Sequence, residues 1–277
     1  MENYKAFSYD IRKNIVDIIV AGGGGHIGGD MSVTDILLTL YFRVMNISPE
    51  NMDDENRDMF VMSKGHCVEA LYAVLAAKGF FPLEEVKEQF SRFGSKFIGH
   101  PNNKLPGIEM NSGSLGHGLP VSIGMALASR MDNRQNRIYV VMGDGELAEG
   151  SVWEGAMAAG MYHLDNLCAV VDRNRLQISG GTEEVMAHDS QTERWSSFGW
   201  NVIEVADGND SEQLLAAFEE AKTVKGKPTV VIANTVKGCG SAVMEHKAAW
   251  HHHVPTEEEY TQIIKDFEAR KEVALNE

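Results

Sequence analysis

Two uninterrupted apolar segments, separated by a stretch with helical spacing, restrict most strongly how this chain can fold. The first segment is Arg137 to Met142 (RIYVVM), and the second is Leu167 to Val171 (LCAVV). Between them, Gly150 to Met161 has the apolar spacing of a helix. Strands that are apolar throughout are typical of parallel sheets covered on both faces, because every side chain is then buried. The sequence therefore predicts a strand–helix–strand unit within a parallel sheet.

The same alternation continues on both sides of this unit. Further strands are expected at Met59–Met62, Asn201–Val205 and Pro228–Ala233. Further helices are expected over about residues 5–20, from near Ser32 to about Met45, over Cys67–Lys78, after Pro82, over Leu119–Met131 and Ser211–Thr223, and after Pro255. Ser91 to Gly116 is rich in Gly, Pro, Asn and Ser, which is typical of a long functional loop. Without a repeat or linker, we expect one doubly wound α/β domain over residues 1–277, with a mostly parallel sheet and helices on both faces.

Composition excludes several functional classes. Lys and Arg number 25 against 40 Asp and Glu, and the resulting net charge of −15 repels nucleic acid and anionic lipid. The sequence has no apolar run near the roughly 18–20 residues that cross a bilayer, and Met1 to Asp10 lacks a signal-peptide pattern. Three cysteines without C-x-x-C spacing argue against a disulfide framework. We expect a cytoplasmic protein in which an anionic ligand needs local help from a metal ion, histidines or helix N-termini.

A carboxylate and an amide follow the two apolar strands. Asp144, in Gly143-Asp144-Gly145, comes directly after the first, and Asn174 follows the second. Because the carboxyl ends of parallel strands meet at one edge of a sheet, both side chains are expected there, where such sheets bind ligands. Two hard oxygen ligands suit Mg²⁺ or Ca²⁺, the carbonyl of Leu176 is a candidate third ligand, and the helix near Gly150 can direct its N-terminal dipole at the same site. The alternative is an exposed glycine-flanked turn.

The glycine run before the second helix has two interpretations. Gly23, Gly25 and Gly28 match G-x-G-x-x-G, but a nucleotide-binding fold needs a strand before these glycines, and the preceding segment has helical spacing. The second interpretation is a flexible linker that happens to contain His26. Neighbouring residues of a helix or strand point apart, so His251 to His253 cannot converge on one metal ion.

The order of these motifs resembles transketolase. Gly-Asp-Gly followed about thirty residues later by Asn is similar to the thiamine-diphosphate motif. The other matching segments, in the family's order, are Gly25-His26-Ile27-Gly28-Gly29, Ser63-Lys64-Gly65-His66, Gly99-His100-Pro101, Gly113-Ser114-Leu115-Gly116-His117-Gly118, Lys237-Gly238 and Trp250-His251. The resemblance covers nearly the whole chain but only the first third to half of a full transketolase. It therefore implies the N-terminal, diphosphate-binding subunit of a split enzyme.

The resemblance also implies roles for individual residues. His26 would face the sugar or cofactor, His100 would bond substrate hydroxyls, and His66 and His251 would contact the diphosphate or move protons, which makes these four the candidate catalytic residues. The candidate cofactor-binding residues are Lys64, His66, Gly113, Leu115, Gly116, Gly143, Asp144, Gly145, Glu149, Asn174, Lys237 and His251. Glu149 resembles a carboxylate that couples two active sites across a dimer. The alternatives are structural: a capping or core His66, a plain loop histidine at position 100, and a Glu149 that only favours a helix N-terminus.

The implied reaction moves a two-carbon ketol unit from a ketose (phosphate) donor to an aldose acceptor. Thiamine diphosphate with Mg²⁺ or Ca²⁺ is the implied cofactor, and a separate subunit with the pyrimidine-binding domain is the implied partner, in an α2β2 assembly. Asp30 and His117 depart from the family pattern; a pocket-facing Asp30 would disfavour an anionic group or bond a sugar hydroxyl. The alternatives are another thiamine-diphosphate enzyme (deoxyxylulose-phosphate synthase-like or 2-oxo acid dehydrogenase-like), a non-catalytic cofactor-binding subunit, and a nucleotide-binding oxidoreductase.

Overall fold

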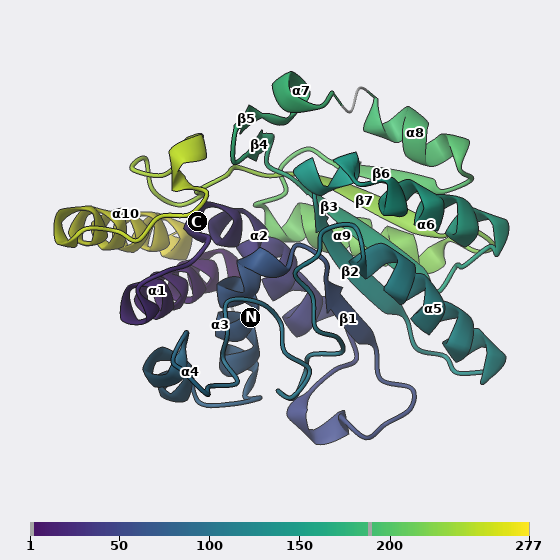
Figure 1. Cartoon of the computed structure of the whole chain (residues 1–277), viewed down its shortest axis with the longest axis horizontal. Coiled ribbons are helices and arrows are strands. Elements are labelled where there is room, and N and C mark those ends of the chain that lie inside the picture. Colours follow the sequence, from purple (N-terminus) through teal and green to yellow (C-terminus); the bar gives the residue numbers. More distant parts are fainter. Residues whose placement is uncertain (1–2, 188–189, 277) are drawn as a thin grey trace.

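A five-stranded parallel sheet forms the centre of the computed structural model, which describes residues 3–187 and 190–276 (Figure 1). Met1, Glu2 and Glu277 of the expected 1–277 domain lie outside the described residues. The strands run in the order β1-β2-β3-β7-β6, with bounds β1 Met59–Met62, β2 Ile138–Gly143, β3 Leu167–Arg173, β6 Asn201–Val205 and β7 Thr229–Asn234. Every pair of neighbouring strands is parallel. The predicted fold class is confirmed.

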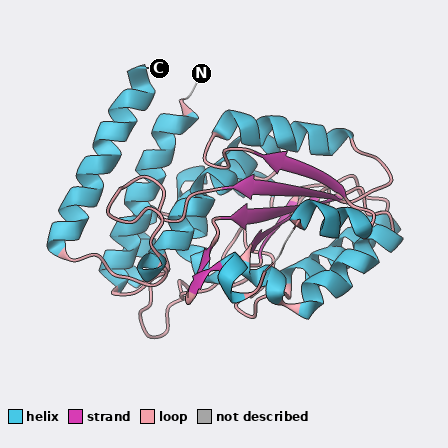
Figure 2. Cartoon of the chain, turned by 90° about the horizontal axis from the view of Figure 1, so that it is seen from above, coloured by secondary structure: helices cyan, strands magenta, loops and turns pink. Residues whose placement is uncertain are grey.

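Helices cover both faces of the sheet, as Figure 2 shows. On β2, Tyr139 and Val141 belong to one buried cluster, while Val140 and Met142 belong to the other. Alternate residues of one strand thus enter different cores, which explains why the strand is apolar throughout. The helices are α1 Tyr4–Gly22, α2 Ile27–Thr39, α3 Val68–Lys78, α4 Leu83–Gln89, α5 Gly118–Met131, α6 Gly150–Met161, α7 Thr182–Val185, α8 Gln191–Ser197, α9 Ser211–Thr223 and α10 Glu257–Asn276. In the described part of the chain, none of them combines the length and apolar character of a membrane span.

Helix α2 begins earlier than the sequence indicated. Its first residue is Ile27 rather than a residue near Ser32, and a π-helical turn, Leu40–Val44, continues it. The glycines permit close packing: a Cβ on Gly28 would lie 2.5 Å from the carbonyl oxygen of Trp250. All thirteen residues of α2 are buried, Gly28 and Gly29 included, and Gly23 is the C-cap of α1, so the glycine run is a short turn between two packed helices rather than a long linker.

The chain between β3 and β6 contains elements that the apolar pattern did not predict. A two-stranded antiparallel hairpin pairs β4 (Leu176–Gln177) with β5 (Gly180–Gly181), and α7 and α8 follow it. These elements are short, and most of their residues are partly or fully exposed. Their sequences therefore lack an extended apolar periodicity. The shorter helical turns are η2 Pro49–Asn51, η3 Gly65–Cys67, η4 Gly145–Ala148 and η5 Ala248–Trp250.

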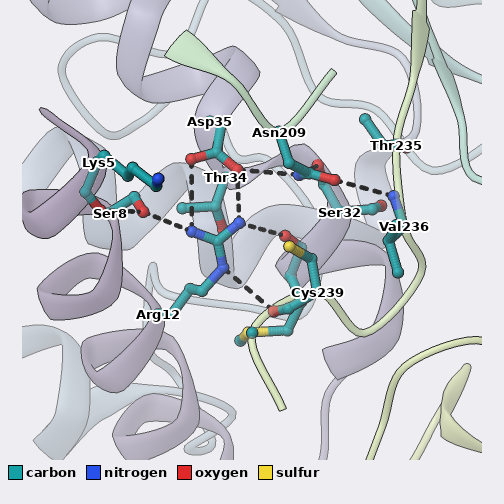
Figure 3. Close-up of polar contacts among 12 residues, drawn as sticks. Lys5, Ser8, Arg12, Ser32, Thr34, Asp35, Asn209, Thr235, Val236 and Cys239 are labelled. Carbon is teal, nitrogen blue, oxygen red and sulfur yellow. Dashed lines mark hydrogen bonds and ion pairs between the residues drawn. The ribbon is translucent and has the colours of Figure 1, made fainter. Parts of the chain in front are cut away.

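A buried ion pair fastens α1 to α2 (Figure 3). The guanidinium of Arg12 donates to Asp35 Oδ2 at 2.5 Å and to the hydroxyl of Ser8 at 2.8 Å, and its Nε donates to the carbonyl of Cys239 at 3.2 Å. Asn209 donates to the same carboxylate oxygen at 2.9 Å and accepts a bond from the backbone N–H of Val236. The network thereby positions the loop that contains Lys237.

Candidate active site

A cavity of about 370 Å³ lies at the carboxyl edge of the sheet. Every candidate residue from the sequence lines it except Gly116 and Glu149. The candidates that line it are His26, Lys64, His66, His100, Gly113, Leu115, Gly143, Asp144, Gly145, Asn174, Leu176, Lys237 and His251. The expectation that strands β2 and β3 are neighbours is confirmed, since Gly143 is opposite Asp172 in their register. Parallel pairing therefore brings together residues that are far apart in sequence.

Oxygen ligands gather on one side of the cavity. The carboxylate of Asp144 accepts the backbone N–H groups of Gly145 at 2.9 Å and Arg175 at 2.6 Å. Burial, and then the charge of Asp172, raise the pKa of Asp144 to about 6, so its ionised form favours a nearby positive charge. Asn174 Oδ1 accepts from the N–H of Leu176. A carboxylate, an amide and a carbonyl form a donor set that suits a hard divalent cation completed by ligand and water oxygens.

Lys64 stabilises this edge of the sheet through Asp172 of β3. Its ammonium contacts the carboxylate of Asp172, with 2% and 0% of the two side chains exposed. Although burial lowers the pKa of Lys64, the charge of Asp172 raises it above its ordinary value. Ser32 donates to Asp172 at 2.6 Å and accepts from Asn174 at 3.1 Å. The positive charge of Lys64 is therefore neutralised within the protein, and the network fixes the rotamer of Asn174.

Histidines gather on the opposite side. The ring of His26 lies 5.1 Å from that of His66, 5.5 Å from that of His251 and 6.5 Å from that of His100, measured between centroids. Burial, and then neighbouring cationic groups, lower the pKa of His26 to about 4 and that of His251 to about 3. Burial also lowers the pKa of His66 and His100. The four imidazoles are neutral at pH 7, so they can both donate and accept hydrogen bonds.

Lys237 connects the two sides. Its ammonium lies 2.9 Å from Nδ1 of His251 and donates to the carbonyl of Leu176 at 3.1 Å. Burial, and then the charge of Lys64, lower its pKa to about 8. An anion between Lys237 and the histidines would relieve this repulsion, and these groups form the donor set that a diphosphate needs.

The structure separates the three consecutive histidines. His251 lines the cavity. His252 is exposed, and its ring lies 4.8 Å from that of His26 at the rim. His253 contacts the carboxylate of Glu259 at 2.9 Å and packs on Trp250. The sequence could not decide which of the three faces the cavity, and the turn after η5 decides it.

In the described residues, no cluster of His, Cys, Asp and Glu has the arrangement of a metal site.

Glu146 is a lining residue that the sequence analysis missed. Its carboxylate accepts the hydroxyl of Ser63 and the backbone N–H groups of Gly116 at 2.8 Å and Gly143 at 3.1 Å. It thereby joins three of the motif segments. The available signal was its place two residues after Asp144. Glu149, the glutamate that the sequence did single out, is exposed at the start of α6 and lies outside the cavity.

Two further expectations need correction. The helical turn that begins at the site is η4, Gly145–Ala148, so the dipole of the helix at Gly150 is not the one next to Asp144. Asp30 is fully buried and His117 is exposed, and neither lines the cavity. Because Asp30 does not face the cavity, neither of the two roles considered for a pocket-facing Asp30 applies.

The hairpin after β3 supplies the other missed lining residues. Gln177, Ile178 and Ser179 border the cavity, and Gly29 lines it from α2. A Cβ on Gly145 would come within 2.9 Å of the Gln177 side chain, so the glycine lets the hairpin approach the strand end. Ile178 is 75% exposed and offers an apolar surface beside the oxygen ligands.

Comparison with known proteins identifies the family. The family model described as "Transketolase, thiamine diphosphate binding domain" matches residues 4–272. The chain belongs to the transketolase family. A strand before the glycine run, which a nucleotide-binding oxidoreductase would require, is replaced by α1.

Several curated relatives are themselves separate subunits of transketolases. The chain is 49% identical over 261 residues to one subunit of the apulose-4-phosphate transketolase of Phocaeicola vulgatus, covering 94% of this chain and 92% of the relative. It is 42% identical over 259 residues to a subunit of the 6-deoxy-6-sulfo-D-fructose transketolase of Clostridium sp. (strain MSTE9), covering 93% and 94%. The solved transketolase from Leishmania mexicana superposes with a TM-score of 0.88 at 28% identity, over 100% of this chain and 45% of that one.

Proposed function

We propose that this chain is the thiamine-diphosphate-binding subunit of a two-chain transketolase. In this function it transfers a two-carbon ketol unit from a ketose (phosphate) donor to an aldose acceptor. The observation that carries the proposal is the cavity that Asp144, Asn174 and Leu176 line together with His26, His66, His100 and His251. The names of relatives that match over nearly their whole length support it.

The residues present fit a metal-bound diphosphate. In the proposed complex, Asp144, Asn174 and Leu176 hold Mg²⁺ or Ca²⁺, and Lys237, His66 and His251 contact the diphosphate. Gly143 and Gly145 let the diphosphate approach the backbone, and Gly113, Leu115 and Gly116 shape the wall beside the cofactor rings. Lys64, which also lines the cavity, acts through its contact with Asp172 and the bonds of Ser32 to Asp172 and Asn174. Bound thiamine diphosphate supplies the nucleophile and the electron sink.

The histidines supply proton transfer and hydroxyl recognition. His26 and His100 are proposed to bond sugar hydroxyls, and His66 and His251 to move protons next to the diphosphate. A neutral imidazole donates through one nitrogen and accepts through the other, which suits an exchange of hydroxyl protons. The Lys237 ammonium donates to Nδ1 of His251, so the ring proton of His251 is expected on Nε2.

The active site is proposed to be completed by a second polypeptide. The chain spans 45% of a solved transketolase, and its relatives are named as subunits. A partner with the pyrimidine-binding domain, in an α2β2 assembly, accounts for both facts. Glu149, exposed at the start of α6, is the proposed carboxylate that couples the two sites.

The proposed substrates are modified sugars. The relatives are named for apulose-4-phosphate and 6-deoxy-6-sulfo-D-fructose, and both sugars carry an anionic group. Apulose-4-phosphate is the first donor to test, because the relative named for it has the higher identity. Pentose phosphates are the comparison substrates.

A calorimetric titration of thiamine diphosphate with Mg²⁺ tests the proposal. It is run on the chain alone, on the chain with its partner subunit, and on the Asp144→Ala variant with the partner. We expect tight binding with the partner and a loss of affinity of about 100-fold in Asp144→Ala, or about 2.7 kcal/mol. Asp207→Ala is the matched control, since exposed Asp207 follows β6 of the same sheet but lies outside the cavity.

The outcomes separate the alternatives. Absence of binding in the presence of a verified partner would overturn the assignment of the metal and diphosphate sites. Binding without ketol transfer from any tested donor would indicate a non-catalytic cofactor-binding subunit. Decarboxylation of a 2-oxo acid in place of ketol transfer would point to another thiamine-diphosphate enzyme.

A further inference from the structure

Two buried carboxyl groups lie behind the histidine side of the cavity. Asp30 is in the first turn of α2 and Glu69 is in the first turn of α3. The backbone N–H of Ala70, the residue after Glu69, donates to the Asp30 carboxylate, and each carboxyl group affects the pKa of the other, so the two side chains are close neighbours. They are 0% and 1% exposed and neither lines the cavity, so contact with a ligand does not explain them.

When both groups are ionised, neither carboxyl group can donate a hydrogen bond to the other. Oδ1 of Asp30 accepts the backbone N–H of Ala70 at 3.0 Å. Its Oδ2 and both carboxylate oxygens of Glu69 have no hydrogen-bond partner among the described residues. Because ionised carboxylates only accept hydrogen bonds, two of them facing each other away from water are costly. One proton on the pair supplies the missing donor and removes one of the two charges.

The electrostatics agree with this geometry. Burial raises the pKa of Asp30 to about 7, and burial followed by the charge of Asp30 raises the pKa of Glu69 well above its ordinary value. The charged and titratable groups facing the pair are Lys64, Cys67 and Tyr72, from η3 and α3 and the turn before them. Lys64 is bonded to Asp172, and burial raises the pKa of the Cys67 thiol and the Tyr72 phenol. These three groups therefore do not titrate between pH 5 and pH 8.

The pair joins the two segments that carry His26 and His66. His26 precedes α2 directly, and its carbonyl accepts the N–H of Asp30 at 3.2 Å. His66 lies in η3, directly before α3. Oε1 of Glu69 packs against Gly25, where a Cβ would come within 2.6 Å. A shift of either carboxyl group therefore moves the turn that holds His26.

We propose that Asp30 and Glu69 share one buried proton and act as positioning residues for His26 and His66. The protonated pair ties the start of α2 to the start of α3 and fixes the distance between the two imidazoles. The inference rests on the proposed function only for the ligand that these histidines contact.

Thermal unfolding of the full chain between pH 5 and pH 8 tests the shared proton. The unfolded-state pKa values lie near 4, below those of the folded pair, so the wild-type chain loses stability as pH rises from about 4 to about 7. In Asp30→Asn the amide donates to Glu69 at every pH. We expect the melting temperature of Asp30→Asn, relative to wild type, to rise by about 5 °C over this range.

The control and the second measurement address the same proton. Asp207→Asn removes an exposed charge and is expected to differ from wild type by a constant amount. Infrared spectra at pH 7 are expected to contain the band of a buried protonated carboxyl in wild type and to lack it in Asp30→Asn. Parallel melting curves for wild type and Asp30→Asn, or the absence of this band from wild type, would overturn the shared proton.

Histidine ring signals in NMR spectra of the full chain test the positioning role. Asp30→Ala removes both the donor and the acceptor, so the signals of His26 and His66 are expected to shift. Asp30→Asn keeps a hydrogen-bond donor toward Glu69 and is expected to leave the signals close to those of wild type. A difference between these two variants is the result expected if Asp30 positions the histidines. Exposed His163 is the internal control. Unshifted signals in a folded Asp30→Ala would overturn the positioning role; for an unfolded Asp30→Ala, the same comparison is made with Glu69→Gln as the rescuing variant and Glu69→Leu as the disruptive one.

None of these three measurements requires the cofactor or the partner subunit. A failed titration of thiamine diphosphate would therefore overturn the proposed function and leave the proton and positioning results standing. Conversely, cofactor binding by the wild-type complex together with an unshifted His26 signal in Asp30→Ala would support the proposed function and overturn the positioning role of the pair.

Discussion

Helix α2 carries two buried aspartates with opposite surroundings. The carboxylate of Asp35 receives the Arg12 guanidinium and the amide of Asn209 (Figure 3). Asp30, five residues earlier, faces the carboxyl group of Glu69. Both aspartates are almost inaccessible to solvent, at 3% and 0% exposed. Residue type, helix and burial are shared, so only the partner differs.

The difference shows two ways of burying a carboxyl group. Around Asp35, several donors replace the water that the carboxylate loses, and the pair with Arg12 connects α1, α2 and the loop at Cys239. Asp30 and Glu69 can only reduce their charge by sharing a proton. The first arrangement reaches the cavity only through Asn209 and the loop that contains Lys237, whereas the second lies against the turn that carries His26.

The largest effect is expected from removing the charge partner of Arg12. Asp35→Ala leaves a guanidinium that is 2% exposed without its counter-charge. We expect the free energy of unfolding to fall by about 3–5 kcal/mol, measured by urea denaturation at pH 7.5. The matched control is Glu212→Ala, which breaks a surface ion pair with Arg43. The Glu212 side chain is 72% exposed, so this variant is expected to lose less than about 1 kcal/mol of unfolding free energy. Equal losses in the two variants would contradict the comparison.

A second variant sharpens it by removing both charges. Arg12→Met combined with Asp35→Leu eliminates the buried ions, so no unpaired charge remains. We expect the double variant to be about 2 kcal/mol more stable than Asp35→Ala, although Asn209 loses its acceptor. The same urea experiment decides this. A double variant less stable than the single one would show that the hydrogen bonds of the pair, rather than its charge balance, dominate.

The smallest effect is expected from Glu69→Gln, which gains stability at alkaline pH whereas Asp35→Ala loses it. The pKa of Glu69 is raised in the folded chain, so the stability gained by binding the proton is complete below about pH 4 and is lost as pH rises. Glu69→Gln removes this dependence. We expect its free energy of unfolding, relative to wild type, to rise by more than about 1 kcal/mol between pH 5.5 and pH 8.5. An equal loss at both values of pH, determined by urea denaturation, would place Glu69 with Asp35 as a structural acceptor.

Much of the fold follows from local pattern. The bounds expected for α6 and α9 agree with the structure, and each predicted strand is present within two residues at either end. Continuous apolar strands and long amphipathic helices carry this information in neighbouring residues. The start of α2 and the hairpin at Leu176 do not, because one depends on close packing against Trp250 and the other is too short to show a period.

The site was predictable in its residues and much less in their roles. Asp144 and Asn174 were located by the rule that parallel strands end at one edge. The commitment of Lys64 to Asp172 joins residues 108 positions apart, and the contact of Glu146 with Ser63 joins residues 83 apart. No local pattern encodes such pairs. The metal and diphosphate contacts themselves remain predictions for the titration to test.

The amino-acid pattern was sufficient for the five strands of the main sheet and the longer helices, and for the chemistry available at the strand ends, because periodicity and turn residues are local properties. Tertiary packing selected which of three consecutive histidines faces the cavity, placed Glu146 rather than Glu149 in its lining, and made Asp30 a buried partner of Glu69. These outcomes depend on which side chains meet across the core, and burial there sets both their hydrogen bonds and their charge.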